Sequence, residues 1–370
     1  PRYYALVKFD GDTMGMWLTG KVEDFPKIKD ILHSTYEWEI ENNIKLLIST
    51  SLHAQISEAL KDFSLNVVPR VTEEYNGVLV YSGGDDVFAM IPIENILDYV
   101  DVIRRFYSGE TFDLELPRRE KLVSENGYIK LEKEGKTQDL YFTMGKATGS
   151  AGIVIAHYST PLSFVIEKAN EAEHRAKHEY HRNAFVFTII RGSGQITNVG
   201  AKWWYKDGEK NESDREIINR IVYIDFLVSL FSGEDSPDPQ KNFFEEDWIR
   251  HLQSVSLSPS IITDLSDEIE FYPVRDDNQE IELLTRLKVL VSRHLEIRFS
   301  DETDKRERAE IRRNVIDSIV QAIHRLHVSL IEDLKKIRKD KSIEEIVNSA
   351  RKDLINLLVL ASFIARKGGE

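Results

Sequence analysis

The order of strand and helix patterns over the first 200 residues is the feature that most constrains the fold of this 370-residue chain. Short runs of apolar and aromatic residues, typical of buried strands, alternate with longer stretches of helical spacing. The order is strand, helix, strand–turn–strand, helix, charged insertion, strand, helix, strand. Its core is the ferredoxin-like βαββαβ plan with one more helix–strand unit, which predicts an antiparallel sheet with helices on one face. The expected strands are residues 3–9, 78–81, 87–91, 149–156 and 184–190, and the expected helices are 27–65, 93–106 and 160–180.

A change of character at about residue 208 predicts a second domain. Before it, the charged and Gly-punctuated residues 109–140 are expected to form a surface insertion with a hairpin around Glu134 and Gly135. After it, strand patterns nearly vanish. We therefore predict an α+β domain over residues 1–208 and an all-α C-terminal domain over residues 209–370. The expected helices of the second domain are residues 213–232, 243–256, 279–298, 303–340 and 342–367.

The composition narrows the class of protein. A net charge of −14 argues against a chain that grips nucleic acid alone, because such domains are usually basic. Residues 281–370 differ from the rest, with 19 Lys and Arg against 15 Asp and Glu. The absence of cysteine excludes disulfides, thiolate zinc sites and cysteine nucleophiles in this chain. No apolar run approaches the roughly 20 residues that span a bilayer, so we expect a cytoplasmic protein with no membrane partner.

Two acidic clusters indicate the chemistry. Asp10-Gly11-Asp12 ends the first predicted strand, and Asp85-Asp86 lies at the tip of the predicted hairpin. In a βαββαβ sheet the first strand lies beside the central hairpin, so we expect the two clusters to meet. Carboxylates brought close repel one another unless a cation compensates, and Mg²⁺ or Mn²⁺ suits such an oxygen-rich site. Two metal ions about 3.5–4 Å apart would activate a 3′-hydroxyl and stabilise a leaving pyrophosphate.

The residues around these clusters suit a nucleotide. Gly83-Gly84 allow a tight turn with positive φ and a close approach to the backbone. Backbone N–H groups of the loop over residues 11–15 could cradle a triphosphate. A lysine near the end of the predicted helix over residues 160–180 would reach the terminal phosphates as a point charge. Each feature alone is more typical of a polar turn or a solvated helix face than of a nucleotide site, but both acidic clusters in this strand order favour catalysis.

Three stretches carry a resemblance to a known family. Residues 81–86 (YSGGDD), between two predicted strands, resemble the GGDD motif of the large, polymerase-like subunit of type III CRISPR effector complexes. Residues 9–15 (FDGDTMG) resemble that subunit in the Cmr subtype, as do residues 150–158 (SAGIVIAHY) with the Thr-Pro-Leu that follows at 160–162. The stretches occur in this order across the predicted palm.

The resemblance implies a nucleotidyltransferase. Recognition of target RNA by the assembled complex would switch on the synthesis of cyclic oligoadenylates from ATP. Its motifs imply Mg²⁺ or Mn²⁺ as the cofactor. They assign catalysis and metal binding to Asp10, Asp85 and Asp86, and nucleotide binding to Gly11, Asp12, Thr13, Met14, Gly83, Gly84 and Lys177.

The resemblance also implies partners and missing domains. The partners would be the other subunits of a type III effector complex, including its small helical subunit, and guide and target RNA held largely through the complex. The full subunit usually has an HD nuclease domain and a first palm, but this chain has no His-Asp dipeptide and one convincing palm. Since the chain also starts at Pro1 without an initiator Met, we expect a C-terminal portion of the subunit.

Two other functions remain open. The first is a stand-alone GGDEF-like cyclase that makes a cyclic dinucleotide, since Ala176-Lys177 and Arg182-Asn183 resemble a pattern of that more distant family. The GGDD-Val sequence and the long helical tail count against it. The second is a non-catalytic scaffold whose palm only binds nucleotide or neighbouring subunits. A purely structural palm has no need of three converging carboxylates.

Two aromatic features are expected to be structural. His157 lies between a predicted strand and a predicted helix, where a hydrogen-bonded structural histidine is more common than a ligand contact. Trp203-Trp204-Tyr205 could stack on a base, but packing at a sheet edge or between domains is the more common role of such residues.

Overall fold

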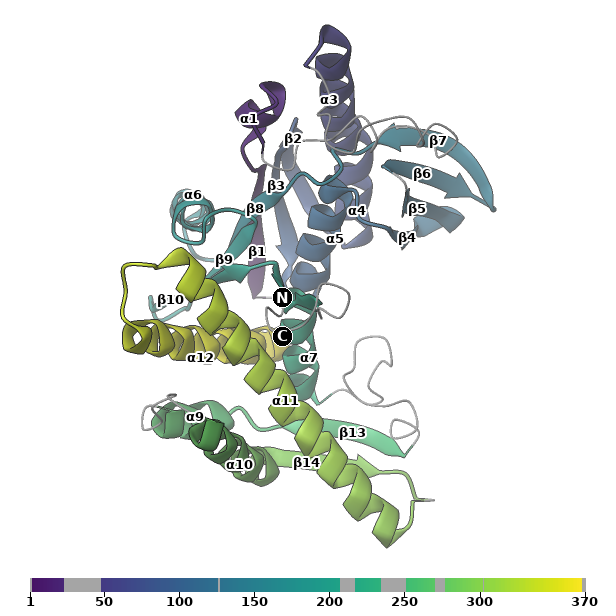
Figure 1. Cartoon of the computed structure of the whole chain (residues 1–370). Helices are drawn as coiled ribbons and strands as arrows, with labels where there is room; N and C mark the ends of the chain where they lie inside the picture. Colours follow the sequence, from purple (N-terminus) through teal and green to yellow (C-terminus); the bar gives the residue numbers. More distant parts are fainter. Residues whose placement is uncertain are drawn as a thin grey trace, which may run out of the picture.

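The computed structural model describes residues 2–22, 48–125, 127–206, 217–233, 251–269, 277–301 and 303–367. Figure 1 shows a mixed region, formed by residues up to about 206, above a mainly helical region formed by the residues beyond 217. This arrangement confirms the α+β fold class and the helical C-terminal region. The boundary predicted at residue 208 lies outside the described residues, and it stays a prediction.

A six-stranded sheet forms the centre of the mixed region. Its strands are β1 (Tyr3–Gly11), β2 (Val78–Gly83), β3 (Asp86–Pro92), β8 (Gly149–His157), β9 (Ala184–Ile190) and β10 (Ile196–Lys202). The order is β10-β9-β8-β1-β3-β2. Because β1 pairs antiparallel with both β3 and β8, its end lies beside the β2–β3 turn and the start of β8. The sequence predicted every one of these strands except β10.

Helices cover both faces of this sheet, so the prediction of helices on one face is wrong. On one face α6 (Leu162–His178) packs against Leu6 and Val154. On the other face α5 (Ile96–Ser108) packs in the cluster that contains Ala5 and Val7. Figure 1 shows α6 and α5 on opposite sides of the strands. The physical reason is that β8 and β9 are buried along almost their whole length, which requires cover on both sides.

Small residues let α6 approach the sheet closely. A Cβ at Gly152 of β8 would lie 2.5 Å from the carbonyl oxygen of Ala169 and 2.3 Å from the nitrogen of Glu173. Ala172 and Ala176 are also buried on this face of the helix. The end of α6 is therefore fixed against the strands that carry the acidic loops.

The α5 side holds the longer helical run that the sequence predicted in part. It consists of α3 (Thr50–Asp62), a π-helical turn over Phe63–Val67, and α4 (Val68–Glu74). A 3₁₀ turn over Ile93–Asn95 leads into α5, as expected from the start predicted at residue 93. Residues 27–47 of the predicted helix lie outside the described residues.

The insertion is larger in structure than a single hairpin. Its strands are β4 (Phe112–Leu116), β5 (Glu120–Glu125), β6 (Tyr128–Lys133) and β7 (Lys136–Phe142), which pair in that order as an antiparallel sheet. The hairpin expected around Glu134 and Gly135 is the β6–β7 turn. Leu122 and Ile129 are buried, so this sheet contributes to the core.

The C-terminal region is helical with small strand pairs. Its helices are α7 (Arg220–Ser232), α9 (Ile261–Ile269), α10 (Asp277–His294), α11 (Lys305–Ile337) and α12 (Ile343–Lys367). The strand pairs are β11 (Trp204–Lys206) with β12 (Ile217–Asn219), and β13 (Leu252–Leu257) with β14 (Leu295–Phe299). The helix predictions were thus wrong over residues 217–219, 252–256 and 295–298, which form strands. Residues 243–250 lie outside the described residues.

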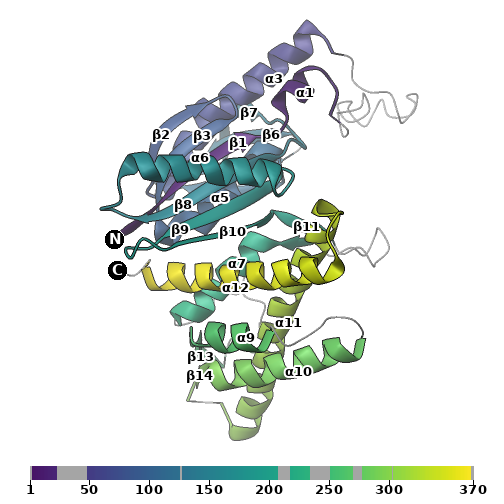
Figure 2. The same ribbon diagram turned by 90° about the vertical axis from the view of Figure 1, so that its left-hand side faces the viewer.

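The hydrophobic core is continuous between the two regions. In Figure 2, α12 runs between β10 above it and α9 to α11 below it. Phe185 of β9, Trp203 and Leu357 of α12 belong to one buried cluster. No helix within the described ranges is long and apolar enough to cross a membrane.

Candidate active site

The register of the sheet brings the two acidic clusters together at one edge. Phe9 pairs with Val87, so Asp10, the next residue of β1, lies toward the start of β3. Gly84, with φ of 65°, turns the chain between β2 and β3 and places Asp85 at the tip. A Cβ built on Gly11 would lie 2.8 Å from Oδ2 of Asp85. The carboxylate of Asp85 therefore rests against the backbone that follows Asp10.

The carboxyl of Asp85 is partly buried, which disfavours its charged form. Burial raises the pKa of Asp85, and the negative charge of Asp86 raises it further. The hydroxyl of Tyr107 would lie 2.1 Å from a Cβ on Gly11, so this hydroxyl and the Asp85 side chain both lie against Gly11. Tyr107 is 1% exposed, and its hydroxyl has no hydrogen-bond partner in the part of the chain that the structure describes. No motif marked Tyr107, so sequence reasoning missed it.

Asp10 is paired with a lysine of α6, on the face of the sheet opposite to α5 and Tyr107. The ammonium of Lys177, in the last turn of α6, forms an ion pair with Asp10 and a second one with Glu173 at 2.7 Å. Burial, followed by the positive charges of Lys8 and Arg182, lowers the pKa of Lys177 to about 8. The predicted neighbourhood of Lys177 and the acidic loops is therefore present, with Asp10 as the nearest carboxylate.

Asp12 lies buried behind the acidic loops. Its side chain is 2% exposed and accepts hydrogen bonds from Thr148 Oγ1 at 2.9 Å, Ser150 Oγ at 2.8 Å and the N–H of Asn183 at 2.8 Å. Its own N–H donates to the carbonyl of Thr148. Burial raises the pKa of Asp12, while these hydrogen bonds lower it. The side chain of Asp12 is thus a buried link between loops, and its predicted backbone contact to the triphosphate stays a prediction.

The chain turns sharply after Asp12. Thr13 has a φ of 57°, and its carbonyl accepts from the N–H groups of Met16 and Trp17. A short helix, α1 (Met14–Leu18), begins there. The first N–H groups of a helix lack partners within it, so the N–H of Met14, at the start of α1, could donate a hydrogen bond to a ligand.

The carboxylates fit a metal that arrives with a nucleotide. Among the described residues, no group of three or more His, Asp or Glu side chains is arranged to hold a metal ion. Mg²⁺ typically binds through one or two carboxylates together with substrate phosphates, and it keeps several waters. Asp10 and Asp85, on neighbouring chain segments, offer that number of ligands.

Two features expected to be structural are so. The Nδ1 of His157 lies 2.6 Å from Oγ of Ser159, and the ring packs edge-on against Tyr3. Trp203 is fully buried, and its indole N–H donates to the carbonyl of Gly149 at 2.8 Å. Both anchor the strands that carry the acidic loops.

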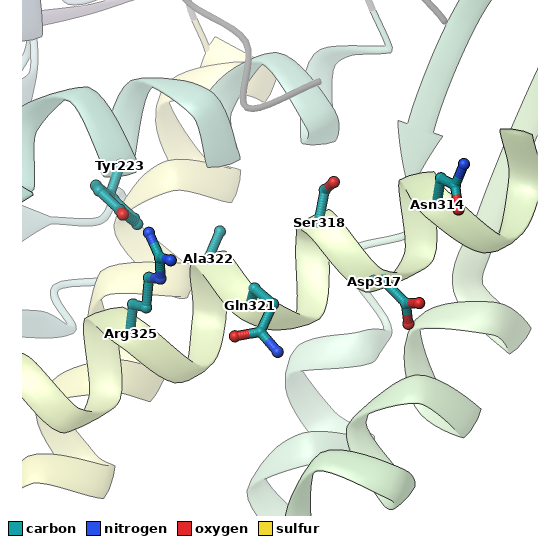
Figure 3. Close-up of a pocket in the computed structure, with 7 residues that line it drawn as sticks. All are labelled: Tyr223, Asn314, Asp317, Ser318, Gln321, Ala322 and Arg325. Carbon is teal, nitrogen blue, oxygen red and sulfur yellow. The ribbon is translucent and has the colours of Figure 1, made fainter. Parts of the chain in front are cut away.

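Two hollows in the helical region lie away from these residues. One, of about 290 Å³, lies between α7 and α11 and is lined by Tyr223, Gln321 and Arg325 among others (Figure 3). The other, of about 510 Å³, lies between α10 and α11. Lys288 and Asp317, which line the second hollow, form an ion pair at 2.8 Å. The lining of the first hollow balances Asp317 with Arg325, whereas the second holds Lys288, Arg293 and Arg313 against Asp317. Neither hollow contains a residue of the two acidic clusters, so the candidate site rests on the carboxylates of the sheet edge.

The sheet order and the paired acidic loops define a palm domain. Residues 3–186 match the family model described as Cas10/Cmr2, second palm domain, and this part of the chain belongs to that family. The matched stretch contains both acidic loops and Lys177.

Relatives and a solved structure agree with this family. The chain is similar to the CRISPR system Cmr subunit Cmr2 of Pyrococcus furiosus, with 30% identity over 204 residues, 54% of this chain and 20% of that protein. Cmr2 of Saccharolobus solfataricus is 30% identical over 141 residues, 35% of this chain and 12% of that protein. A chain of a Type III-B Cmr-beta complex bound to cognate target RNA has a TM-score of 0.51 and 16% identity, over 87% of this chain and 39% of that chain. The latter likeness supports the fold alone, and the chain spans a fifth or less of either relative.

Proposed function

We propose that this chain makes cyclic oligoadenylates from ATP within a type III CRISPR effector complex, when that complex recognises target RNA. The observation that carries the proposal is the placement of the Asp85 carboxylate against Gly11, directly after Asp10, with Lys177 on the opposite side of Asp10. Asp85 and the Asp10–Lys177 pair then lie at the same end of the strands, on either side of β1, where a nucleotide with its metal ion could reach both carboxylates. Transfer of a nucleotidyl group needs this combination, since negative charge develops on the phosphates.

Each residue has a stated part in the proposal. Asp10 and Asp85 would hold Mg²⁺ or Mn²⁺, which arrives with ATP, and Asp86 would add negative charge beside them. Bound there, the metal would lower the pKa of the attacking 3′-hydroxyl and neutralise the leaving pyrophosphate. Asp85, whose pKa is raised by burial, would give up any proton it holds when a cation approaches. Lys177 would exchange Asp10 for the terminal phosphates.

The backbone would position the triphosphate. We propose contacts from Gly11, Thr13 and Met14 on one loop and from Gly83 and Gly84 on the other. A Cβ on Gly84 would meet nothing within 4 Å, but its φ of 65° favours glycine. The openness at this turn supports the approach of a ligand to the hairpin tip.

The partners are proposed from the relatives and from the surface of α11. The relatives are Cmr subunits, and one solved neighbour is a complex with target RNA. Many basic side chains of the helical tail already have partners within the chain: Arg308 donates to the carbonyl of Thr303, and Lys335 pairs with Glu332. We therefore propose that guide and target RNA are held by the assembly in the cytoplasm, with the small helical subunit as a further partner.

Product analysis tests the proposal. The assembled complex would be incubated with ATP or GTP, Mg²⁺ and target RNA, and the products identified by mass spectrometry. We expect oligoadenylates that require RNA and that disappear in the Asp85→Ala, Asp86→Ala double variant, with assembly preserved. Asp113→Ala with Glu115→Ala, which removes two exposed carboxylates of β4, is the matched control and should leave synthesis intact.

Other outcomes would assign the alternatives. A cyclic dinucleotide made from GTP without RNA would identify a GGDEF-like cyclase. An absence of product from a complex that binds RNA normally would leave the nucleotide-binding scaffold. Unchanged synthesis in the double variant would overturn the assignment of the acidic site.

A further inference from the structure

The loop between α6 and β9 has an unusual backbone. His181, Arg182 and Asn183 follow one another with φ values of 53°, 62° and 46°. Residues with side chains rarely adopt this left-handed conformation, and three in succession persist only where the surroundings hold them. The contacts of this loop therefore determine its conformation more than its own sequence does.

One side of the loop is held by the palm. The N–H of Asn183 donates to the buried carboxylate of Asp12 at 2.8 Å. The N–H of Arg182 donates to the carbonyl of Ala176 at 3.1 Å, next to Lys177 in the last turn of α6. The charge of Arg182 acts on both Asp12 and Lys177. The loop is thus part of the support of the lysine that faces Asp10.

The other side is held by one lysine. The ammonium of Lys202, the last residue of β10, donates to the carbonyl of His181 at 2.9 Å and to that of Arg182 at 2.5 Å. Burial lowers the pKa of Lys202. A half-buried ammonium that contacts two carbonyls of a strained loop has a specific position, because its charge is costly to bury without such acceptors. No sequence motif marked Lys202.

Lys202 is in turn fixed by the helical region. Its carbonyl accepts from Nη1 of Arg220, at the start of α7, at 2.9 Å. Arg220 is fully buried and donates to the carbonyl of Ser329 of α11 at 2.9 Å, while Asp333 lies 2.8 Å from its Nη1. A continuous series of polar contacts therefore leads from α11 through Arg220 and Lys202 to the loop, and from the loop to Asp12.

We propose that Lys202 is a positioning residue for nucleotide binding: it holds residues 181–183 in their left-handed conformation and so fixes Lys177 beside Asp10, as the helical region dictates. The proposal deepens the function proposed above and rests on it for the role of Lys177. We call Lys202, with its contacts to the carbonyls of His181 and Arg182, the clamp. Through Arg220, the clamp is held by α7 and α11 of the helical region. Movement of these helices would therefore alter the phosphate side of the site without any change in Asp10 or Asp85.

Hydrogen exchange tests the clamp without reference to activity. In the assembled complex without nucleotide, Lys202→Met should raise the exchange rate of the amides at residues 182 and 183 about tenfold, since the loop that presents them to Ala176 and Asp12 is no longer held. Lys133→Met, which removes an exposed lysine of the insertion sheet paired with Glu120, should leave those amides unchanged. Unaltered exchange in the Lys202 variant would overturn the proposal.

Rescue separates positioning from a general loss of stability. Glycine adopts positive φ readily, so His181→Gly should restore slow exchange in the Lys202→Met background. In the same pair of variants, the KM for ATP should rise about tenfold in Lys202→Met with kcat less affected, and return toward the starting value with His181→Gly. A failure of His181→Gly to restore either quantity, in a complex with an unchanged melting temperature, would show that the clamp is not the cause.

A second variant covers the case in which Lys202→Met does not fold. Asp333→Asn weakens the partner of Arg220 and should raise exchange at residues 182 and 183 by a smaller factor; no change there would contradict the link to the helical region. Exchange that responds as expected in a complex that makes no oligoadenylate would overturn the proposed function while leaving the clamp in place.

Discussion

Asp10 and Lys177 form an ion pair that joins the end of β1 to the last turn of α6. The lysine also contacts Glu173, one turn earlier in the same helix. A positive charge therefore already faces the carboxylate that we propose as a metal ligand. Lys177 and a divalent cation would compete for Asp10, and a nucleotide would resolve the competition because its phosphates offer the lysine another partner.

Removing the lysine should thus affect metal and nucleotide in opposite directions. In Lys177→Met, Asp10 loses its counter-charge, and we expect Mn²⁺ without nucleotide to bind about three- to tenfold more tightly. The KM for ATP should rise about tenfold or more, because the terminal phosphates lose a cation. Titration of free Mn²⁺ by electron paramagnetic resonance and steady-state kinetics measure the two effects.

A neighbouring lysine provides the control for that variant. Lys168 lies on the same helix but pairs with Glu171 at 2.7 Å. Lys168→Met should leave both Mn²⁺ affinity and the KM for ATP within about twofold of the original protein. Equal Mn²⁺ affinity in the Lys177 variant and the original protein would contradict the competition.

The close contact at Gly11 predicts a second sharp difference. A Cβ at Gly11 would lie 2.1 Å from the Tyr107 hydroxyl and 2.8 Å from the Asp85 side chain, so Gly11→Ala must displace one of them. We expect it to lower the free energy of unfolding by about 1–3 kcal/mol and to abolish synthesis. Gly192→Ala is the control, since its Cβ would lie an ordinary 3.6 Å from the Tyr3 hydroxyl and should change neither quantity. Denaturant titration and product analysis would decide, and retained synthesis in Gly11→Ala would show that Asp85 is not required where it stands.

The strands of the palm could be predicted because their apolar runs are local signals. The cover on both faces could also have been inferred, since Ile153-Val154-Ile155-Ala156 is apolar without alternation and such a strand is buried on both sides. The strand at Leu295–Phe299 was missed because its alternating apolar residues follow a helical pattern without a break.

The place of Asp12 could not be predicted from the sequence. Its partners Thr148, Ser150 and Asn183 are more than 130 positions away and include a backbone N–H, which no motif marks. The meeting of Asp10 with the hairpin followed from strand order alone, but the lysine clamp at Lys202 depends on three-dimensional contacts between β10, the α6–β9 loop and α7. Local patterns thus predicted the strands, the helices and the meeting of the acidic clusters. Which carboxylate is a buried structural group and which lies at the candidate site depends on long-range contacts that no local pattern shows.

The different roles of Asp12 and Asp85 can be measured by comparing two alanine variants. Asp12→Ala leaves two hydroxyls and the N–H of Asn183 without their buried acceptor, so the free energy of unfolding should fall by about 2–4 kcal/mol. Asp85→Ala removes a carboxylate whose pKa is raised by burial, so stability at pH 7.5 should be unchanged or slightly higher while synthesis is lost. Chemical denaturation of both variants checks this, and an equal loss of stability in the two would refute the distinct roles.

The last prediction concerns Asp353, a residue of α12 whose carboxyl lies near charged residues at the end of α6. Burial raises its pKa to about 6, against the opposing influence of Arg338, Arg175 and Lys352, while Glu179 raises it further. Tyr180 also lies near Asp353; burial raises the pKa of its phenol above the range of the experiment, so it stays neutral. The carboxyl of Asp353, with its raised pKa, therefore titrates within the range from pH 4 to 7.

The sign of the pH dependence follows from proton binding. Between about pH 4 and pH 6 the folded protein holds a proton on Asp353 that the unfolded chain has lost, so this carboxyl makes stability fall as the pH rises through that window. Above pH 6 the loss is constant, at about 2–3 kcal/mol. Asp353→Asn has no such group, so its advantage over the original protein in free energy of unfolding should be small near pH 4, grow up to pH 6 and stay level to pH 8. Denaturant titrations at pH 4.5, 6 and 7.5 measure this difference, and an equal difference at all three values would show that Asp353 is not buried as a proton-binding group.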